Sequence, residues 1–152
     1  PHESGKARFH FESPRPLPEP TDEAFPFALL TGRGSSSQFH TGTRTGKSRV
    51  LSKLHRPGCA VEIHPKDAAR LGIRSEERVR VRSRRGTLIA SALVRETVRE
   101  GELFISMHDV STNRLTFPAF DPYSRQPSYK HCAVRVERIV DAEGSGFPGA
   151  AD

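Results

Sequence analysis

The apolar residues of this chain fall into about six short segments, each bounded by Gly, Pro or polar residues. The clearest segment is RVRVRS, Arg78 to Ser83, in which valine alternates with arginine. A period of two places the valines on the inner face of a strand and the arginines on its outer face. The sequence predicts strands at residues 26–31, 60–64, 77–83, 87–94, 102–107 and 132–139, with short helical segments at 48–54 and 67–72. Short strands with one or two small helices indicate a mainly β, closed barrel rather than a parallel-sheet fold.

A length of 152 residues suits one domain, and the two ends differ from the middle in composition. Residues 1–24 are polar and rich in proline, and we expect an extended lead-in there. Residues 25–140 are expected to form the barrel, and residues 141–152 have the composition of a disordered tail. The chain opens with Pro1 rather than Met, which suggests a processed product or a fragment.

The segment with the most functional information is TGRGSSSQFHTGTRTGK, Thr31 to Lys47, which directly follows the first predicted strand. Its glycines allow the backbone to come close to a ligand, and its hydroxyl and amide groups can surround phosphate oxygens. Arg33, Arg44 and Lys47 would neutralise the ligand's charge. These residues indicate a site for an anionic ligand that contains a diphosphate. A flexible polar loop fits the composition equally well.

This segment ends in a sequence that is close to a phosphate-binding P-loop but does not match it. The stretch GTRTGKS, Gly42 to Ser48, is one residue short, because Thr41 stands where the motif requires its first glycine. The motif also requires a strand directly before it and a long helix directly after it, and neither is predicted here. The sequence therefore argues against a P-loop nucleotide hydrolase.

Composition restricts the remaining classes of function. Cys59, Cys132 and the seven histidines show no metal-ligand spacing. No apolar run approaches the length of a membrane span. The formal charge of +6 raises the question of nucleic-acid binding, and the basic run from Arg78 to Arg85 is its densest patch. That run lacks the interleaved aromatic residues of single-strand binders, so a solvated or docking face is favoured.

Several short motifs in a fixed order carry a resemblance to a known family. The motifs are Thr31–Arg33, Gln38–Lys47, Val61–Ile73, Val79–Gly86, Gly101–Ile105, Asn113–Thr116, Asp121–Pro122 and Gln126–Lys130. Together they resemble the C-terminal cofactor-binding domain of the dimethyl sulfoxide reductase superfamily, molybdenum oxidoreductases that carry bis(molybdopterin guanine dinucleotide). The resemblance spans roughly residues 5–139. It is strongest to assimilatory nitrate reductases, with formate dehydrogenases and periplasmic nitrate reductases as near relatives.

The resemblance implies a double-psi β-barrel and a set of residues that contact the dinucleotide. The matching loop positions are Thr31, Gly32, Arg33, Gln38, His40, Thr41, Thr43 and Arg44. Asn113 and Lys130 match two further contacts, and taken alone they fit an Asx-type turn and a solvated charge. Met107 and His108 match positions that line the substrate approach in a relative, and a histidine without a role at a strand end is the favoured alternative there. No metal ligand is expected in this chain.

The resemblance also implies a role within a larger enzyme. The parent would reduce nitrate to nitrite in the cytoplasm, while a [4Fe–4S] cluster and the molybdenum ligand would belong to other domains. The partner would be the remaining domains of the parent or a catalytic subunit, and the isolated chain would have no turnover. A parent of the formate dehydrogenase type, or a stand-alone basic barrel that binds nucleic acid or acts as an adaptor, are the alternatives. The first hypothesis predicts that the loop, Asn113 and Lys130 converge on one rim of the barrel.

Overall fold

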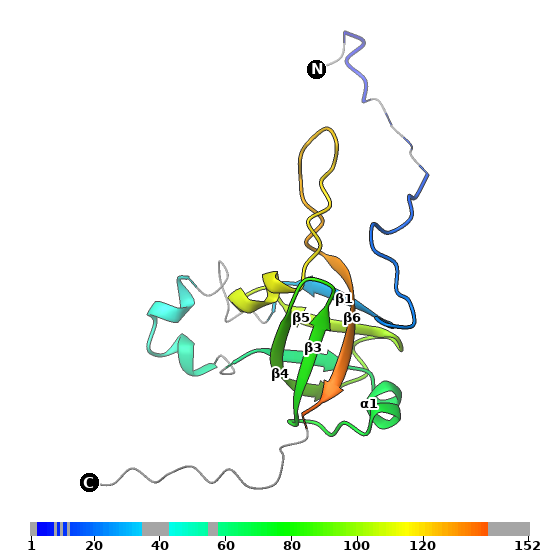
Figure 1. The fold of residues 1–152 in the computed structure, drawn as a ribbon. Helices are drawn as coiled ribbons and strands as arrows, with labels where there is room; N and C mark the ends of the chain where they lie inside the picture. The colour runs from blue at the N-terminus through cyan, green and yellow to red at the C-terminus, as the bar shows by residue number, and fades with distance from the viewer. Residues whose placement is uncertain are drawn as a thin grey trace, which may run out of the picture.

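The computed structural model describes residues 3–7, 9, 11, 13–34, 43–54 and 58–139. Six strands in these ranges form a closed barrel in the order β1–β5–β2–β4–β3–β6 (Figure 1). The strands are β1 Phe27–Gly32, β2 Ala60–Ile63, β3 Arg78–Ser83, β4 Thr87–Val94, β5 Glu102–Ser106 and β6 His131–Arg138. The helices are α1 Pro65–Leu71 and the 3-10 helices η1 Thr45–Lys47, η2 Leu51–Leu54 and η3 Val110–Arg114. The predicted mainly β, double-psi barrel class is confirmed.

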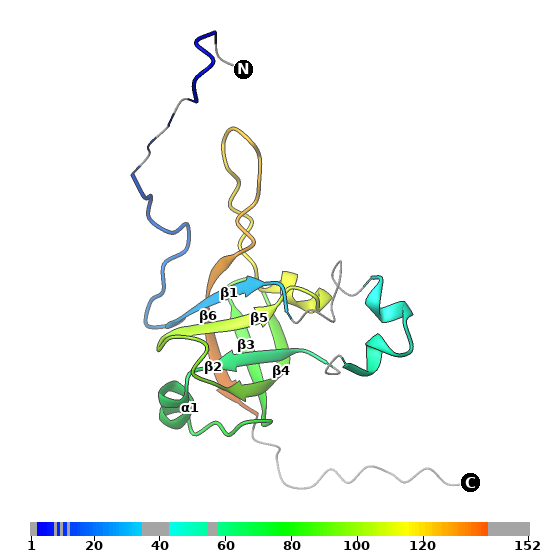
Figure 2. The same cartoon turned by 180° about the vertical axis from the view of Figure 1, so that it is seen from behind.

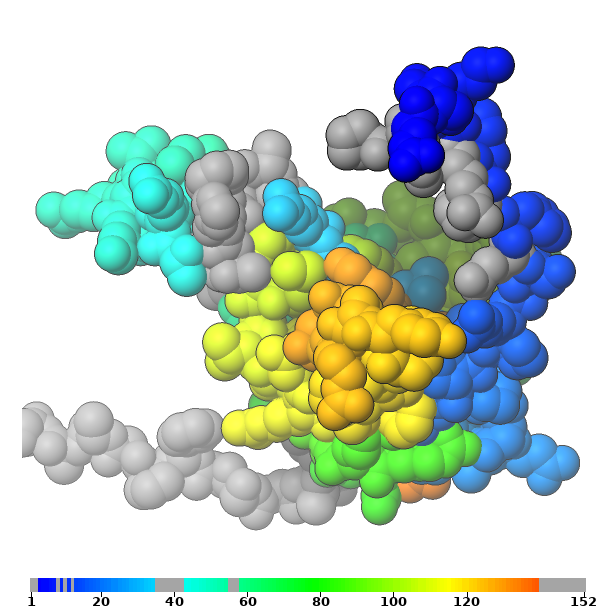
Figure 3. Space-filling model, turned by 90° about the horizontal axis from the view of Figure 1, so that it is seen from above, coloured from blue at the N-terminus to red at the C-terminus, as the bar shows by residue number. Residues whose placement is uncertain are grey.

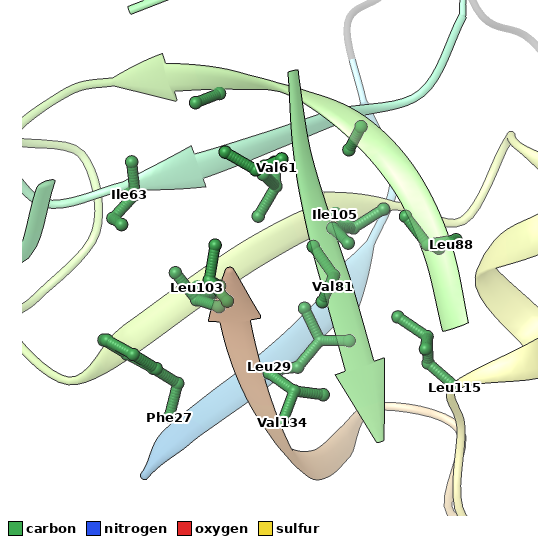
Figure 4. Packing of buried hydrophobic residues seen from close by; sticks show 14 of the residues in the cluster. Phe27, Leu29, Val61, Ile63, Val81, Leu88, Leu103, Ile105, Leu115 and Val134 are labelled. Carbon is green, nitrogen blue, oxygen red and sulfur yellow. The ribbon is translucent and has the colours of Figure 1, made fainter. Parts of the chain in front are cut away.

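The alternation read from the sequence produces the core of the barrel. Val79 and Val81 of β3 are fully buried, while the arginines that alternate with them are exposed. Leu29 from β1 and Leu103 from β5 point into the same interior (Figure 4). The neighbouring strands β1 and β5 run parallel, as do β2 and β4, and the other pairs are antiparallel. Hydrophobic burial inside this closed ladder is the main force that holds the fold together.

Helix α1 begins two residues before the predicted segment. Pro65 stands at the first helical position, where its missing amide hydrogen costs nothing, and the ring of His64 accepts a hydrogen bond from the Lys66 amide. Gly72 ends the helix in the left-handed conformation, with φ of 66°. No helix in the described part of the chain is long and apolar enough to cross a membrane.

Strand direction decides which loops lie together. Because β1 and β5 are parallel and β6 is antiparallel to β1, the ends of β1 and β5 meet the start of β6. The same pairing places the end of β3 and the starts of β2 and β4 at this end of the barrel. We call this end the loop rim. The connections 33–59, 84–86 and 107–130 all leave from it, and Figure 2 shows the barrel from behind with β1, β5 and β2 in front. Helix α1 connects β2 to β3 at the opposite end.

The segment before β1 is bonded to the barrel through one buried carboxylate. Glu19 is 7% exposed and accepts hydrogen bonds from Arg85 at 2.7 Å, from Arg84 at 3.0 Å and from the Ala133 amide at 3.1 Å. The ladder between β3 and β6 ends at Val134, so Glu19 satisfies an amide of β6 just beyond that ladder. We call these contacts the Glu19 clamp.

Gly86 in the β3–β4 turn allows close contact between that turn and η3. A Cβ atom at this position would lie 2.7 Å from the carbonyl oxygen of Arg114. Because that neighbour is backbone, it cannot rotate away, and Gly86→Ala is expected to destabilise the fold by about 2 kcal/mol. Thermal unfolding of purified variants measures this. Gly46→Ala is the control, since no atom of the described residues lies within 4 Å of a Cβ there. Equal melting temperatures for the two variants would show that the turn and η3 do not need this close approach.

Candidate functional site

Thr31 connects the end of β1 to the segment that carries Lys130. Its hydroxyl donates to the carbonyl of Tyr129 at 2.5 Å, and its amide donates to the carbonyl of Lys130 at 3.1 Å. Thr31 is 7% exposed. The hydroxyl proton is therefore used inside the protein, and the effect of Thr31 is to fix the backbone on which Lys130 stands.

Gly32 continues this end of β1 beneath the start of the loop. A Cβ atom there would lie 3.1 Å from the ring of Phe104, so a larger residue would push against β5. Its carbonyl accepts a hydrogen bond from the Met107 amide at 2.8 Å. Arg33, the next residue, is exposed. The backbone of Gly32 is thus held close to β5, and the exposed Arg33 follows it as the first cation of the loop.

Helix η3 brings Asn113 to the same rim. The hydroxyl of Thr112, which is 1% exposed, donates to the carbonyl of Ser106 at the end of β5, at 3.1 Å. Asp109 caps the helix by accepting from the Ser111 amide at 2.8 Å. Asn113 itself is exposed, and its side chain makes no hydrogen bond within the described residues. Its amide is therefore available to a ligand.

Lys130 stands at the base of a hairpin that rises from the rim. Phe120 pairs with Pro127 across this hairpin, and Asp121 organises its tip by accepting from the amide and hydroxyl of Ser124 at 2.7 and 2.9 Å. Those hydrogen bonds lower the pKa of Asp121. From the sequence, this stretch is predicted to be irregular, because a single side-chain cap and a single backbone bridge produce no periodic pattern of residues. Lys130 is exposed where the hairpin returns to β6.

The predicted site residues therefore divide into three groups. Thr31, Gly32, Arg33, Asn113 and Lys130 all lie on the loop rim, and Figure 3 shows the light-blue end of β1 beside the yellow and orange residues of the rim. The exposed residues Thr43 and Arg44 lead into η1, on the arm that leaves the rim between β1 and β2. The predicted contacts Gln38, His40 and Thr41 lie outside the described residues.

Met107 and His108 lie directly after β5, beside Gly32. The His108 amide donates to the hydroxyl of Ser106 at 3.3 Å. Both residues are partly exposed on the loop rim. Their role in lining a substrate path stays a prediction.

Arg85 is a supporting residue that sequence reasoning assigned to the basic outer face. Its side chain is only 24% exposed, and it donates from Nε and Nη2 to the carbonyl of Leu115, just after η3, at 3.1 and 2.9 Å. It also pairs with Glu19 and lies over the ring of Phe117, 5.1 Å from its centre. The hydrogen bond from Arg85 to Glu19 raises the pKa of the guanidinium. The sequence does carry a signal for this. The alternation of arginine and valine ends at Ser83, so Arg85 need not lie on the outer face of the strand.

The thiols of the chain are not poised for chemistry. Burial raises the pKa of Cys59 to about 12 and that of Cys132 to about 11, so both stay protonated at neutral pH. They are free cysteines, and Cys132 is fully buried. No group of His, Cys, Asp and Glu within the described ranges could hold a metal ion.

A closed barrel with cations, an exposed amide and tightly packed backbone on one rim is suited to binding a polar, anionic ligand. The matching family model is the Molydopterin dinucleotide binding domain, over residues 27–133, and this chain belongs to that family. The resemblance inferred from the motifs is therefore confirmed.

Nitrate reductases and a formate dehydrogenase subunit align along most of this chain. It is 42% identical over 141 residues to a nitrate reductase of Symbiobacterium thermophilum, covering 88% of this chain and 18% of the relative. It is 38% identical over 123 residues to the alpha subunit of F420-dependent formate dehydrogenase 1 of Methanococcus maripaludis, covering 80% and 18%. The assimilatory nitrate reductase of Haloferax mediterranei is 37% identical over 137 residues, covering 89% and 19%. The chain thus spans about a fifth of the length of these relatives.

A solved structure supports the fold. Acetylene hydratase from Pelobacter acetylenicus superimposes with a TM-score of 0.64 at 17% identity, over 76% of this chain and 18% of that one. At this identity the likeness concerns the fold alone. Acetylene hydratase, a much longer chain, therefore contains a barrel of the same fold.

Proposed function

We propose that this domain holds bis(molybdopterin guanine dinucleotide), with its molybdenum, in a larger oxidoreductase. The observation that carries the proposal is the convergence of Gly32, Arg33, Asn113 and Lys130 on the loop rim. The diphosphates of such a cofactor are anionic, and exposed Arg33 and Lys130 supply compensating charge. The amide of Asn113 can both donate and accept toward a heterocycle. When bound, the cofactor supplies the redox chemistry, and the chain binds and orients it.

The distribution of exposed apolar side chains supports a larger parent. Among the described residues twelve large apolar side chains are prominently exposed, and eight of them lie at the end of β1 or on the connections that leave the loop rim. These eight are Leu30, Val50, Leu51, Leu54, Val110, Phe120, Tyr123 and Tyr129. These side chains lie on segments that leave the same end of the barrel, and exposed apolar surface of this kind usually marks an interface. The covering partner in this proposal is the remaining polypeptide of the oxidoreductase, on the same chain or as a catalytic subunit.

The proposed parent reaction is the two-electron reduction of nitrate to nitrite for assimilation in the cytoplasm. Two nitrate reductases at 42% and 37% identity favour it, one of them assimilatory. A formate dehydrogenase type of parent is the second candidate, favoured by the relative at 38% identity. In both cases the isolated domain has no turnover, and any [4Fe–4S] cluster belongs to the remaining polypeptide.

Replacing Lys130 by alanine tests the cofactor site. In the polypeptide as its gene encodes it, Lys130→Ala is expected to lower bound molybdenum and releasable guanine nucleotide together by about fivefold, the effect of losing one charged hydrogen bond. Metal analysis and chromatography of the acid-released nucleotide measure the two quantities. Lys66→Ala is the matched control, because Lys66 is an exposed lysine on α1 that pairs with Glu100. Full cofactor content in Lys130→Ala, or equal losses in both variants, would contradict the assignment.

A further inference from the structure

The outer face of β3, β4 and β6 presents arginines in a pattern that the cofactor site does not use. Arg78, Arg80 and Arg82 are exposed along β3, and Arg135 lies across from Arg82 on β6. One acidic residue, Glu137, lies among them. We call these five residues the arginine face. Figure 1 looks onto β3, β4 and β6, and the described residues leave the front of β3 uncovered.

Charge on this face is only partly compensated. Glu137 accepts Arg135 at 2.7 Å and lies 3.6 Å from Arg80, so one carboxylate serves two guanidinium groups. Arg78 and Arg82 form no ion pair within the described residues. Four arginines and one glutamate therefore leave a net charge of +3 on neighbouring positions of two strands, β3 and β6.

The register adds a second observation. Arg82 and Arg135 are direct partners across β3 and β6, an arrangement that opposes pairing because like charges face each other. A carboxylate at either position would stabilise the sheet, as Glu137 opposite Arg80 does. Two arginines that face each other do not stabilise the isolated barrel, but they would attract a partner with a negatively charged surface.

The composition of the face favours a protein over a nucleic acid. Ile89 of β4 lies opposite Arg80 and is 39% exposed, which places an apolar side chain amid the arginines. An apolar centre within a charged surround is typical of protein interfaces, in which arginine is also enriched. The strand positions of the face hold no aromatic side chain on which a base could stack. We propose that the arginine face docks a protein surface rich in carboxylates.

This docking surface lies on the side of the barrel, with Arg82 toward the loop rim and Arg78 toward the opposite end, and does not depend on the proposed cofactor. Its charge would steer a negatively charged partner toward the domain, with an on-rate that falls as salt rises. The site therefore differs from the cofactor site in ligand and in place.

Charge reversal on the full 152-residue chain tests the proposal, with a fluorescent poly-L-glutamate 20-mer as the probe. We expect the double variant Arg78→Glu, Arg82→Glu to weaken binding of this peptide by about tenfold at low salt. Its melting temperature should be unchanged or higher, since a carboxylate would then face Arg135 across the two strands. The matched control is Arg95→Glu, Arg99→Glu, which changes net charge equally on the exposed loop between β4 and β5. That control should weaken binding by less than about threefold.

Three outcomes would overturn the proposal. Equal weakening by both double variants would show that only net charge matters. Tighter binding of a DNA duplex of about 20 base pairs than of the peptide, lost in the β3 variant, would assign the face to nucleic acid. Undetectable peptide binding by the unmodified chain at low salt would remove the docking site altogether. None of these outcomes bears on the molybdenum content that tests the cofactor site.

Discussion

Replacing Glu19 with alanine is expected to destabilise the chain by about 3 kcal/mol, although Glu19 precedes the first strand of the barrel. Its carboxylate is buried and accepts from two arginines and one β6 amide. Removing it would leave the partly buried guanidinium of Arg85 without its counter-charge and the Ala133 amide without an acceptor. Loss of one partner from such a group costs far more than loss of an exposed ion pair.

Thermal unfolding followed by circular dichroism measures this effect, with an expected fall in melting temperature of roughly 6–12 °C. Asp22→Asn is the control, because Asp22 pairs with Arg84 on the surface and its side chain is 51% exposed. The control should cost less than about 1 kcal/mol. If Glu19→Ala and Asp22→Asn melt at the same temperature, the Glu19 clamp is not a structural element.

The same carboxylate gives the stability of the chain a defined acid dependence. Burial opposes ionisation of Glu19, but hydrogen bonds from Arg85, the Ala133 amide and Arg84 outweigh it and lower its pKa from the ordinary 4.5. The stabilisation is therefore complete above that value and is lost as pH falls through the lowered pKa. Burial also lowers the pKa of His131 from 6.5, so protonation of His131 removes stability already below that pH. Glu19→Ala should thus remove the step below about pH 4.5, and because the Glu19 carboxylate also raises the pKa of His131, the step below pH 6.5 should become larger.

The architecture was predictable because its signals are local. Alternation in β3, the Pro65 start and Gly72 stop of α1, and the glycine turn before β4 each depend on residues close in sequence. The closed order of the strands depended on the resemblance, since pairings such as β1 with β5 join residues more than 70 positions apart. No alternation within one strand states which distant strand lies beside it.

The candidate site was predictable in its exposed residues and not in its supports. Lys130 and Asn113 could be identified from their motifs and lie on one rim in the structure. The contacts that place them there involve Thr31 with Tyr129, and Arg85 with Leu115. Each joins side chain to backbone across a long sequence separation, so neither residue type nor spacing reveals it. Arg85 was therefore grouped with the outward arginines of β3, although most of its side chain is buried.

Leu115 links the stability of the barrel to the position of Asn113. It follows η3 directly, is fully buried, and points into the barrel toward Leu88 (Figure 4). Its carbonyl also accepts both hydrogen bonds from Arg85. The Leu115 side chain thus closes the core at the loop rim. Its carbonyl, held by Arg85, fixes the end of η3, the helix that presents Asn113.

Leu115→Ala is therefore expected to cost about 3 kcal/mol, because it removes buried methyl groups and leaves a cavity where the rim loops meet the core. Chemical denaturation with a common slope for both proteins measures the free energy of unfolding. Val110→Ala in η3 is the control, since Val110 is 89% exposed, and its effect should stay within about 0.5 kcal/mol. In the gene-encoded polypeptide, Leu115→Ala should also reduce cofactor content, because η3 loses its anchor while Asn113 itself is intact. A stable Leu115→Ala variant would mean that η3 rests on the barrel without closing it, and that the rim is held by Arg85 and Thr112 alone.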